Sequence, residues 1–244
     1  MIQTERTAIV LRTADYKEYD RMLTLFSPTR GLVEAASRGC RRPRSHLLSA
    51  SQPFALGDFE LFEKNGRATV TGFTLIENFY ALRKDYDRLR CGFWLLSLCK
   101  AVLQPGQAAQ SLFMLLLHTL SRLNFTDQPL RPLLAGFLVN FAACEGFRPR
   151  LRHCVVCGRE LGGEEPACFD LREGGLVCAE HAKPGTPPIT PAMRRFLSAA
   201  LREPASAWLE DEERQAPMDL MRRYIEPRLE RPLHVQPPEE RELP

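Results

Sequence analysis

The first third of the chain alternates short apolar runs with turn residues, a pattern typical of β-strands. Five runs rich in Val, Thr, Phe and Leu follow one another, at Thr7–Thr13, Met22–Phe26, Leu32–Ala36, Phe54–Glu63 and Ala68–Phe79. The last two flank Asn65-Gly66, and this pair supplies the two positive φ angles that a type I′ hairpin turn needs. Because no amphipathic helix separates the runs, the pattern predicts a small closed or half-closed barrel, either an OB-fold or an SH3-like barrel.

From residue 82 onward this alternation gives way to long runs rich in Leu, Ala and Phe, which predict helices. Three such runs lie at Leu82–Leu103, Ala108–Leu123 and Leu130–Cys144. The middle run is apolar on nearly every side and is therefore predicted to be the buried centre of a bundle. Two later helices are predicted, from Pro191 to Leu201 and from about Pro217 to the Glu226-Pro227 pair.

These elements predict an α+β protein with an N-terminal five-stranded barrel, an all-helical domain and a small inserted module. The length of 244 residues exceeds that of most single domains. We expect a barrel over 1–80, a helical domain over 81–150, a cysteine-rich module over 151–186, and C-terminal helices over 187–244 that pack on the helical domain.

Charge is distributed unevenly along the chain, although the net charge is only +3. Residues 1–50 contain nine Arg or Lys and five Asp or Glu, whereas residues 201–244 contain seven bases and eleven acids. One basic face is therefore expected rather than a uniformly basic surface. The longest apolar stretch, Leu112–Leu117, is far shorter than a membrane span, and the polar start differs from a secretory signal, so we expect a cytoplasmic protein.

The strongest chemical motif is Cys154-Val-Val-Cys157 followed by Cys178-Ala-Glu-His181. Two ligand pairs with this spacing are typical of zinc knuckles and ribbons, and soft or borderline donors favour zinc. We therefore expect one structural Zn²⁺ held by these four residues, with His153 and Cys168 as alternatives for the fourth ligand. Four protein ligands leave no open position for water, so a catalytic zinc is not expected.

A second motif places four arginines in seven residues, between two predicted strands: Arg38, Arg41, Arg42 and Arg44. Clustered guanidinium groups suit bidentate contacts with phosphate, so this segment is a candidate DNA-binding loop. Lys17 and Arg21 extend it if the barrel brings them together. The alternative interpretation is a solvated run of charges without a ligand. Four phenylalanines on the predicted strands, at 54, 59, 62 and 73, could stack on bases, but aromatic residues that alternate along strands are more often core residues, so none is assigned to a site.

Motifs of the common enzyme classes are absent from the sequence. It contains no glycine-rich loop of the nucleotide-binding kinds, no G-x-S-x-G elbow, and no group of acids among the predicted strands that would hold magnesium. A non-enzymatic protein is expected.

Several segments resemble bacterial RecO proteins. They include Ile9-Val-Leu-Arg-Thr-Ala-Asp-Tyr-Lys-Glu-Tyr-Asp-Arg, Ser37-Arg-Gly-Cys-Arg-Arg-Pro-Arg-Ser, Leu75-Ile-Glu-Asn-Phe-Tyr-Ala-Leu-Arg and Arg223-Tyr-Ile-Glu-Pro-Arg-Leu. The resemblance covers almost the whole chain and implies an OB-fold barrel, a helical domain and an inserted zinc ribbon. One departure is the second metal pair, which is Cys-x-x-His here and generally Cys-x-x-Cys in the metal-binding members.

The resemblance also implies a recombination mediator that binds single- and double-stranded DNA and anneals complementary strands. The implied partners are RecR, RecA and the C-terminal tail of the single-strand-binding protein. Candidates for that acidic tail are basic residues near apolar helices: Arg122, Arg131, Arg148 and Arg150. The main alternative is a protein-binding adaptor with weak DNA binding. A zinc-dependent nuclease or deaminase is a third, disfavoured hypothesis, because no H-x-E arrangement accompanies the metal motif.

Overall fold

The computed structural model describes residues 2–202 and 216–229, which fall into two compact units. The first unit contains the described chain up to Thr126, and the second contains the described residues from Asp127 onward. The predicted C-terminal segment 187–244 lies partly outside the described residues. No helix in the described ranges is long and apolar enough to cross a membrane.

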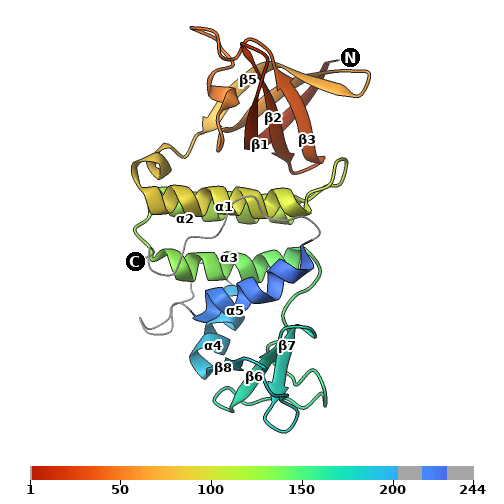
Figure 1. Ribbon diagram of the computed structural model, residues 1–244, viewed down its shortest axis with the longest axis vertical. Coiled ribbons are helices and arrows are strands. Elements are labelled where there is room, and N and C mark those ends of the chain that lie inside the picture. Colours follow the sequence, from red (N-terminus) through yellow and green to blue (C-terminus); the bar gives the residue numbers. More distant parts are fainter. Residues whose placement is uncertain (1, 203–215, 230–244) are drawn as a thin grey trace. The chain divides into compact units, whose positions relative to one another are not determined.

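A closed five-stranded barrel forms the N-terminal part of the first unit, as predicted (Figure 1). Its strands are β1 (Ile2–Tyr16), β2 (Asp20–Ser27), β3 (Gly31–Ser37), β4 (Leu56–Lys64) and β5 (Arg67–Glu77). They pair in the order β1-β2-β3-β5-β4, and only the β3–β5 pair is parallel. Closure pairs every strand on both sides, so the barrel has no free edge.

The predicted hairpin turn is confirmed, since Lys64 pairs with Arg67 and both central residues have positive φ, 52° at Asn65 and 71° at Gly66. Alternate residues of each strand face inward and fill the barrel with Ala, Val, Leu and Phe side chains. Cys40 and Leu47, from the connection between β3 and β4, belong to the same core.

Two helices complete the first unit, α1 (Tyr86–Val102) and α2 (Gln110–Phe125), and a short 3₁₀ turn, η2 (Tyr80–Lys84), precedes them. α1 begins later than predicted because η2 occupies the start of the expected run and Asp85 caps the helix. Both helices contact the barrel through aromatic rings. Phe113 of α2 packs edge-on against Phe26 at 5.1 Å, and Phe93 of α1 packs against Phe54 at 4.8 Å between ring centroids.

The prediction that the middle helix is the buried centre was wrong. α2 buries one side only, and Met114 and Phe125 are 54% and 66% exposed. The helix buried almost throughout is α3 (Leu130–Cys144) in the second unit, where α4 (Pro191–Ala200) and α5 (Ala216–Ile225) pack on it. Both apolar runs look alike in sequence, but only α3 is covered by two other helices of its own unit.

The second unit also contains a three-stranded sheet of order β7-β6-β8, with strands β6 (Ala167–Asp170), β7 (Gly175–Cys178) and β8 (Pro188–Ile189). β6 and β7 pair around a turn that contains Gly174, whose φ is 70°, and β8 pairs with the other edge of β6. Tyr224 and Arg228 tie this sheet to the helices. The Tyr224 ring packs edge-on against Phe169 of β6 at 5.4 Å between ring centroids, and Arg228 donates to the carbonyls of Leu171 and Arg172 in the turn between β6 and β7.

Backbone hydrogen bonds join the turn between β2 and β3 to the loop between α1 and α2. The N–H groups of Leu32, Gly106 and Ala109 donate to carbonyls across this junction at 2.8–3.2 Å. Gly31 lies at its centre with φ +64°, and a Cβ there would lie 2.3 Å from the Gln104 carbonyl oxygen. The close approach of two backbones therefore requires glycine at this position.

Gly31→Ala is expected to lower the free energy of unfolding by clearly more than the roughly 1–2 kcal/mol that a left-handed alanine costs alone. The excess arises because the new methyl group collides with backbone carbonyls that cannot yield. The control is Gly66→Ala, with φ +71° and no atom within 4 Å of the added Cβ. Urea denaturation of both variants checks this, and equal losses would show that the junction tolerates a side chain.

Candidate metal centre and nucleic-acid interface

The first half of the metal motif forms a tight turn between Cys154 and Gly158. The Gly158 N–H donates to the Cys154 carbonyl at 2.9 Å, and the Cys154 N–H donates to the Arg159 carbonyl at 2.8 Å. Gly158 has φ +75°, which closes the turn at no steric cost. Both cysteine side chains of this motif are thereby directed to one side of the turn.

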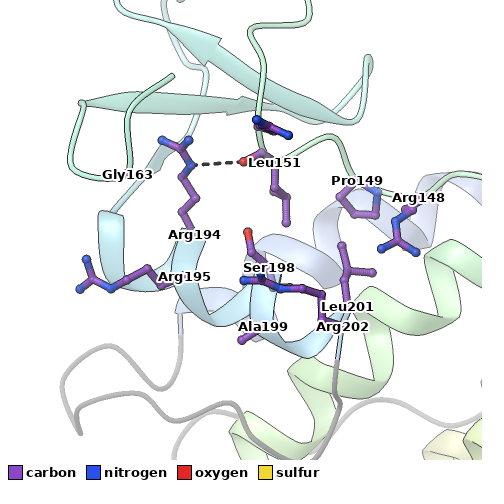
Figure 2. A pocket seen from close by; sticks show the side chains of 11 residues that line it. Arg148, Pro149, Leu151, Gly163, Arg194, Arg195, Ser198, Ala199, Leu201 and Arg202 are labelled. Carbon is purple, nitrogen blue, oxygen red and sulfur yellow. Dashed lines mark hydrogen bonds between the residues drawn. The ribbon is translucent and has the colours of Figure 1, made fainter. Parts of the chain in front are cut away.

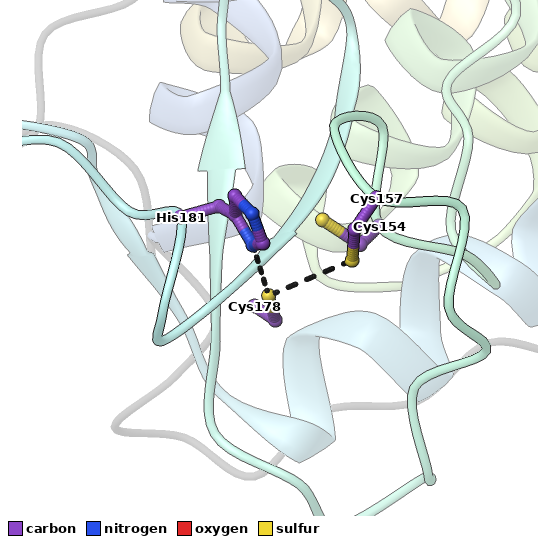
Figure 3. Close-up of side chains that lie close together, drawn as sticks. All are labelled: Cys154, Cys157, Cys178 and His181. Carbon is purple, nitrogen blue, oxygen red and sulfur yellow. Dashed lines mark hydrogen bonds between the residues drawn. The ribbon is translucent and has the colours of Figure 1, made fainter.

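The second half follows β7, where Cys178 ends the strand and His181 lies in the next turn, its N–H donating to the Cys178 carbonyl at 3.0 Å. The Val155 N–H donates to the Leu176 carbonyl at 2.8 Å, which docks the first turn on β7. As a result, the ligand atoms of all four residues of the predicted set lie within 4.8 Å of one another (Figure 3). His153 and Cys168, the alternative fourth ligands, are not members of this group.

The geometry of this Cys₃His group fits a single tetrahedral ion. Zinc–sulfur bonds of about 2.3 Å place two sulfurs roughly 3.8 Å apart. The Sγ atoms of Cys157 and Cys178 are 4.0 Å apart, and the Cys178 Sγ lies 3.1 Å from the His181 Nδ1. The four residues therefore form a site that accommodates a metal ion.

The electrostatics of the group favour thiolate at two of its cysteines. Burial disfavours the charged form of Cys154, but backbone hydrogen bonds from Cys157, Cys178 and Val156 outweigh it and lower its pKa. The pKa of Cys178 is also lowered, because hydrogen bonds from the neighbouring thiols and the His181 backbone outweigh burial. Thiolate is the form that binds metal.

The arginine loop, residues 38–44, folds onto the hairpin between β1 and β2. Cys40 is fully buried in the barrel core, the Gly39 N–H donates to the Asp20 Oδ1 at 2.8 Å, and the Arg41 N–H donates to the Tyr19 carbonyl at 3.1 Å. The structure thus brings the loop and the Lys17–Arg21 segment into contact.

Side chains of the loop and the hairpin form a mixed cationic and aromatic surface. Arg41 and Arg21 both pair with Asp15, at 3.2 Å and 3.0 Å. Arg42 lies over the Tyr19 ring at 5.4 Å, and Lys17 lies over the Tyr16 ring at 5.5 Å. The exposed side chains of Arg38 and Arg44 have no partner among the described residues.

A third candidate site is a pocket of about 760 Å³ in the second unit, which we call the arginine pocket (Figure 2). Its apolar lining includes Leu151 and Leu201, and its basic lining consists of Arg148, Arg152, Arg194, Arg195 and Arg202. Arg194 is buried and donates to the carbonyls of Leu151, Leu161 and Gly162, so it holds the wall of the pocket. Arg152 and Arg195 pair with Glu160 and Glu164.

Comparison with known proteins identifies the family. Residues 1–79 match the model of the recombination protein O N terminal, and residues 83–237 match that of its C terminal. A DNA repair protein RecO of Alkaliphilus metalliredigens is 36% identical over 178 residues, which are 73% of this chain and 71% of that protein. Another, from Anaeromyxobacter sp. (strain K), is 35% identical over 204 residues, 83% of this chain and 79% of that protein. The chain belongs to the RecO family.

Membership of the RecO family makes this chain a DNA repair and recombination protein and agrees with the expected lack of enzymatic function. The two family models meet between residues 79 and 83, where the barrel gives way to η2. The resemblance drawn from the sequence is thereby confirmed.

The sequence patterns did not predict the aromatic part of this candidate interface. Tyr16 and Tyr19 are 48% and 40% exposed in the β1–β2 hairpin, and their signal was a pair of aromatic residues interleaved with charges in a predicted turn. Phe54 and Phe59 are buried, as expected for core residues, and Phe73 packs against the barrel core, but Phe62 is 36% exposed and lies outside it. The arginine pocket was also missed, because its residues lie about 50 positions apart and only the fold joins them.

Proposed function

We propose that this RecO-family protein is a recombination mediator that binds single- and double-stranded DNA, anneals complementary strands and assists RecA loading on DNA coated by single-strand-binding protein. The main support for the proposal is the position of the arginine loop. Hydrogen bonds hold this loop against the β1–β2 hairpin of the barrel, which carries the exposed Tyr16 and Tyr19. Guanidinium groups bind phosphate in either form of DNA, while exposed rings stack on unpaired bases. Annealing follows because bound cations screen the repulsion between two polyanionic strands.

Within the loop, the two arginines without partners are the first candidates for phosphate binding. Arg38 and Arg44 are exposed, and binding a phosphate breaks no existing ion pair of either. Arg41, Arg42, Arg21 and Lys17 would contribute positive charge from positions already fixed by Asp15, Tyr19 and Tyr16. The proposed DNA interface is therefore the whole set of six basic residues.

The Cys₃His group supports a second part of the proposal, one structural Zn²⁺ per chain bound by Cys154, Cys157, Cys178 and His181. Three thiolates and one imidazole complete a tetrahedral shell, so bound zinc would fix the turn at Cys154 to the end of β7. Its contribution would be to the folding of the small module, since four protein ligands leave no position for a substrate.

The proposed partners are RecR, RecA and the single-strand-binding protein, in the bacterial cytoplasm near the nucleoid. The arginine pocket is the proposed site for the acidic tail of the single-strand-binding protein, since it combines guanidinium groups with an apolar lining. Of the four candidate arginines only Arg148 lines it. Arg131 is 3% exposed, Arg150 donates to the Glu173 carbonyl, and Arg122 lies on α2 in the other unit.

Metal analysis of the purified protein is expected to give one zinc per chain, and Cys178→Ser is expected to lose that zinc and unfold the small module. The matched control is Cys168→Ser, a cysteine of the same sheet outside the ligand group, which should keep its zinc. The proposal is wrong if the wild-type protein folds fully and contains no metal.

Replacing Arg38 and Arg44 together by alanine is expected to weaken DNA binding and to flatten the plot of log affinity against log salt by about one to two units. Each phosphate that the protein no longer neutralises reduces the steepness of that plot by roughly 0.7–0.9. The control, Lys64→Ala with Arg67→Ala, removes the same charge from the exposed β4–β5 hairpin of the same barrel. Fluorescence anisotropy over a salt series measures both, and an equal effect of the two double variants would exclude a specific role of the loop.

A peptide with the acidic tail sequence is expected to bind the wild-type protein and to bind Arg148→Ala with Arg202→Ala roughly tenfold more weakly, because the variant cannot form the charge-assisted hydrogen bonds. The control is Arg172→Ala with Arg223→Ala, two exposed arginines of the same unit outside the pocket. Calorimetric titration at low salt checks this. Undiminished binding to the pocket variant would place the tail site elsewhere.

A further inference from the structure

Four of the five tyrosines of this chain share an unusual environment. They lie in the first unit, are 40–72% exposed, and each has a cationic side chain over its ring, in the pairs Tyr16–Lys17, Tyr19–Arg42, Tyr80–Lys84 and Tyr86–Arg90. The cations lie 5.4–5.7 Å from the ring centroids. The fifth, Tyr224, also has a cation over its ring, Arg228 at 4.0 Å, but it is buried, so exposure is what sets the other four apart. Two of the exposed pairs belong to the proposed DNA interface, and the other two have no assigned role.

Tyr80 is exposed because the residues around it are anchored. Phe79 adopts a left-handed conformation with φ 48°, and its side chain is 1% exposed, while Leu82 is fully buried. Arg83 donates to the carbonyls of Asn78 and Pro53 at 2.8 Å and 3.0 Å, which fixes η2 to the barrel. With its neighbours anchored in this way, the Tyr80 ring faces solvent on a rigid turn.

Tyr86 begins α1, and the end of α2 is held beside it. Arg88 donates to the carbonyls of Leu123 and Thr126, and the Leu82 N–H donates to the Asn124 side chain. Phe125 is the last residue of α2 and directly precedes the C-cap, Thr126. It is 66% exposed. We call Tyr80, Tyr86 and Phe125 the aromatic corner: three exposed aromatic residues on segments that hydrogen bonds between η2, the start of α1 and the end of α2 join together.

The charge around the aromatic corner is positive. Segment 80–90 contains four bases, Arg83, Lys84, Arg88 and Arg90, and two acids, Asp85 and Asp87. Asp85 pairs with Arg88 at 3.6 Å and caps the first turn of α1, so its charge is largely compensated. Exposed rings beside an excess of cations match the chemistry of single strands, which present π-faces and phosphates together.

We propose that the aromatic corner is a second binding site for single-stranded nucleic acid, which stacks unpaired bases on Tyr80 and Tyr86 while Lys84 and Arg90 face the phosphates. The inference rests on the proposed DNA binding and extends it. β5 ends at Glu77, which pairs with Leu56 of β4. Leu56 also pairs with Ile9 of β1, and Ile9 precedes Tyr16 by seven residues along that strand. The two aromatic sites are therefore separate, and one molecule would hold two strands at once.

Photo-crosslinking tests the contact directly with the full-length protein and an oligonucleotide that contains 5-iododeoxyuridine. Peptide mapping should find adducts at Tyr80 or Tyr86 in addition to any at Tyr16 and Tyr19. Adducts confined to the β1–β2 hairpin would overturn the second site while leaving the proposed function intact. An absence of DNA binding by the wild-type protein would instead refute the proposed function itself.

A variant series supplies the energetic test. Tyr80→Ala with Tyr86→Ala should weaken binding of a single strand at least fivefold, the effect of removing one stacking interaction of about 1 kcal/mol, and should slow annealing. Binding to a blunt duplex should stay unchanged, because paired bases do not offer their faces. Tyr80→Phe with Tyr86→Phe keeps the rings and should bind like the wild type.

The Arg38→Ala with Arg44→Ala variant, in contrast, should weaken binding to single strands and duplexes alike. Two results would overturn the proposal. The double tyrosine-to-alanine variant could lose duplex binding as much as single-strand binding, or it could bind single strands as tightly as the wild-type protein does. In the second case the corner would be a surface for another protein.

Discussion

The burial of one small side chain, that of Cys40, holds the proposed interface in place. Arginines crowded into a seven-residue loop repel one another, so their charges cannot order the loop. The loop is ordered by Cys40, which fills part of the barrel core, and by the backbone N–H groups of Gly39 and Arg41, which donate hydrogen bonds to the β1–β2 hairpin. Because a buried side chain and backbone N–H groups anchor the loop, the guanidinium groups of Arg38 and Arg44 remain available to a ligand.

The second unit meets the same need for order in a different way. Its small sheet buries few large side chains, chiefly Phe169, Leu176 and Val177, and a module of this size rarely folds on such a core alone. Four soft donors within 4.8 Å provide the cross-link that a metal ion would complete. Arg228 donates to the carbonyls of Leu171 and Arg172 in the turn between β6 and β7, and the Tyr224 ring packs edge-on against Phe169 of β6, so these two residues fasten the module to the C-terminal helical segment.

Features encoded locally were predictable from the sequence, whereas those that depend on tertiary burial were not. Asn65-Gly66 determines its own turn, and the spacing of Cys154 and Cys157 determines theirs, because a few consecutive residues carry the geometry. The choice between α2 and α3 as the buried helix depends on which elements cover each helix, and apolar composition does not contain that information. β8 is likewise a strand only because β6 lies beside it.

The candidate sites divide along the same line. The Cys₃His group and the arginine loop are short motifs, so counting residues was enough to propose them. The aromatic corner unites η2, the start of α1 and the end of α2, and the arginine pocket unites residues from 148 to 202. Exposure is what distinguishes Tyr80 from a core aromatic residue, and exposure follows from the anchoring of Phe79 and Leu82 on either side of it.

Asp15 orders part of the proposed DNA interface before any ligand binds. Its carboxylate holds Arg21 and Arg41 at 3.0 Å and 3.2 Å, yet its side chain is 57% exposed. Exposed ion pairs contribute only about 0–1 kcal/mol, so a phosphate can replace this carboxylate at small cost. Arg21 and Arg41 are thus positioned before a ligand binds, so part of the entropy of ordering these two side chains is already lost on folding. A surface held by such weak pairs suits the exchange of one bound strand for another, which the proposed annealing activity requires.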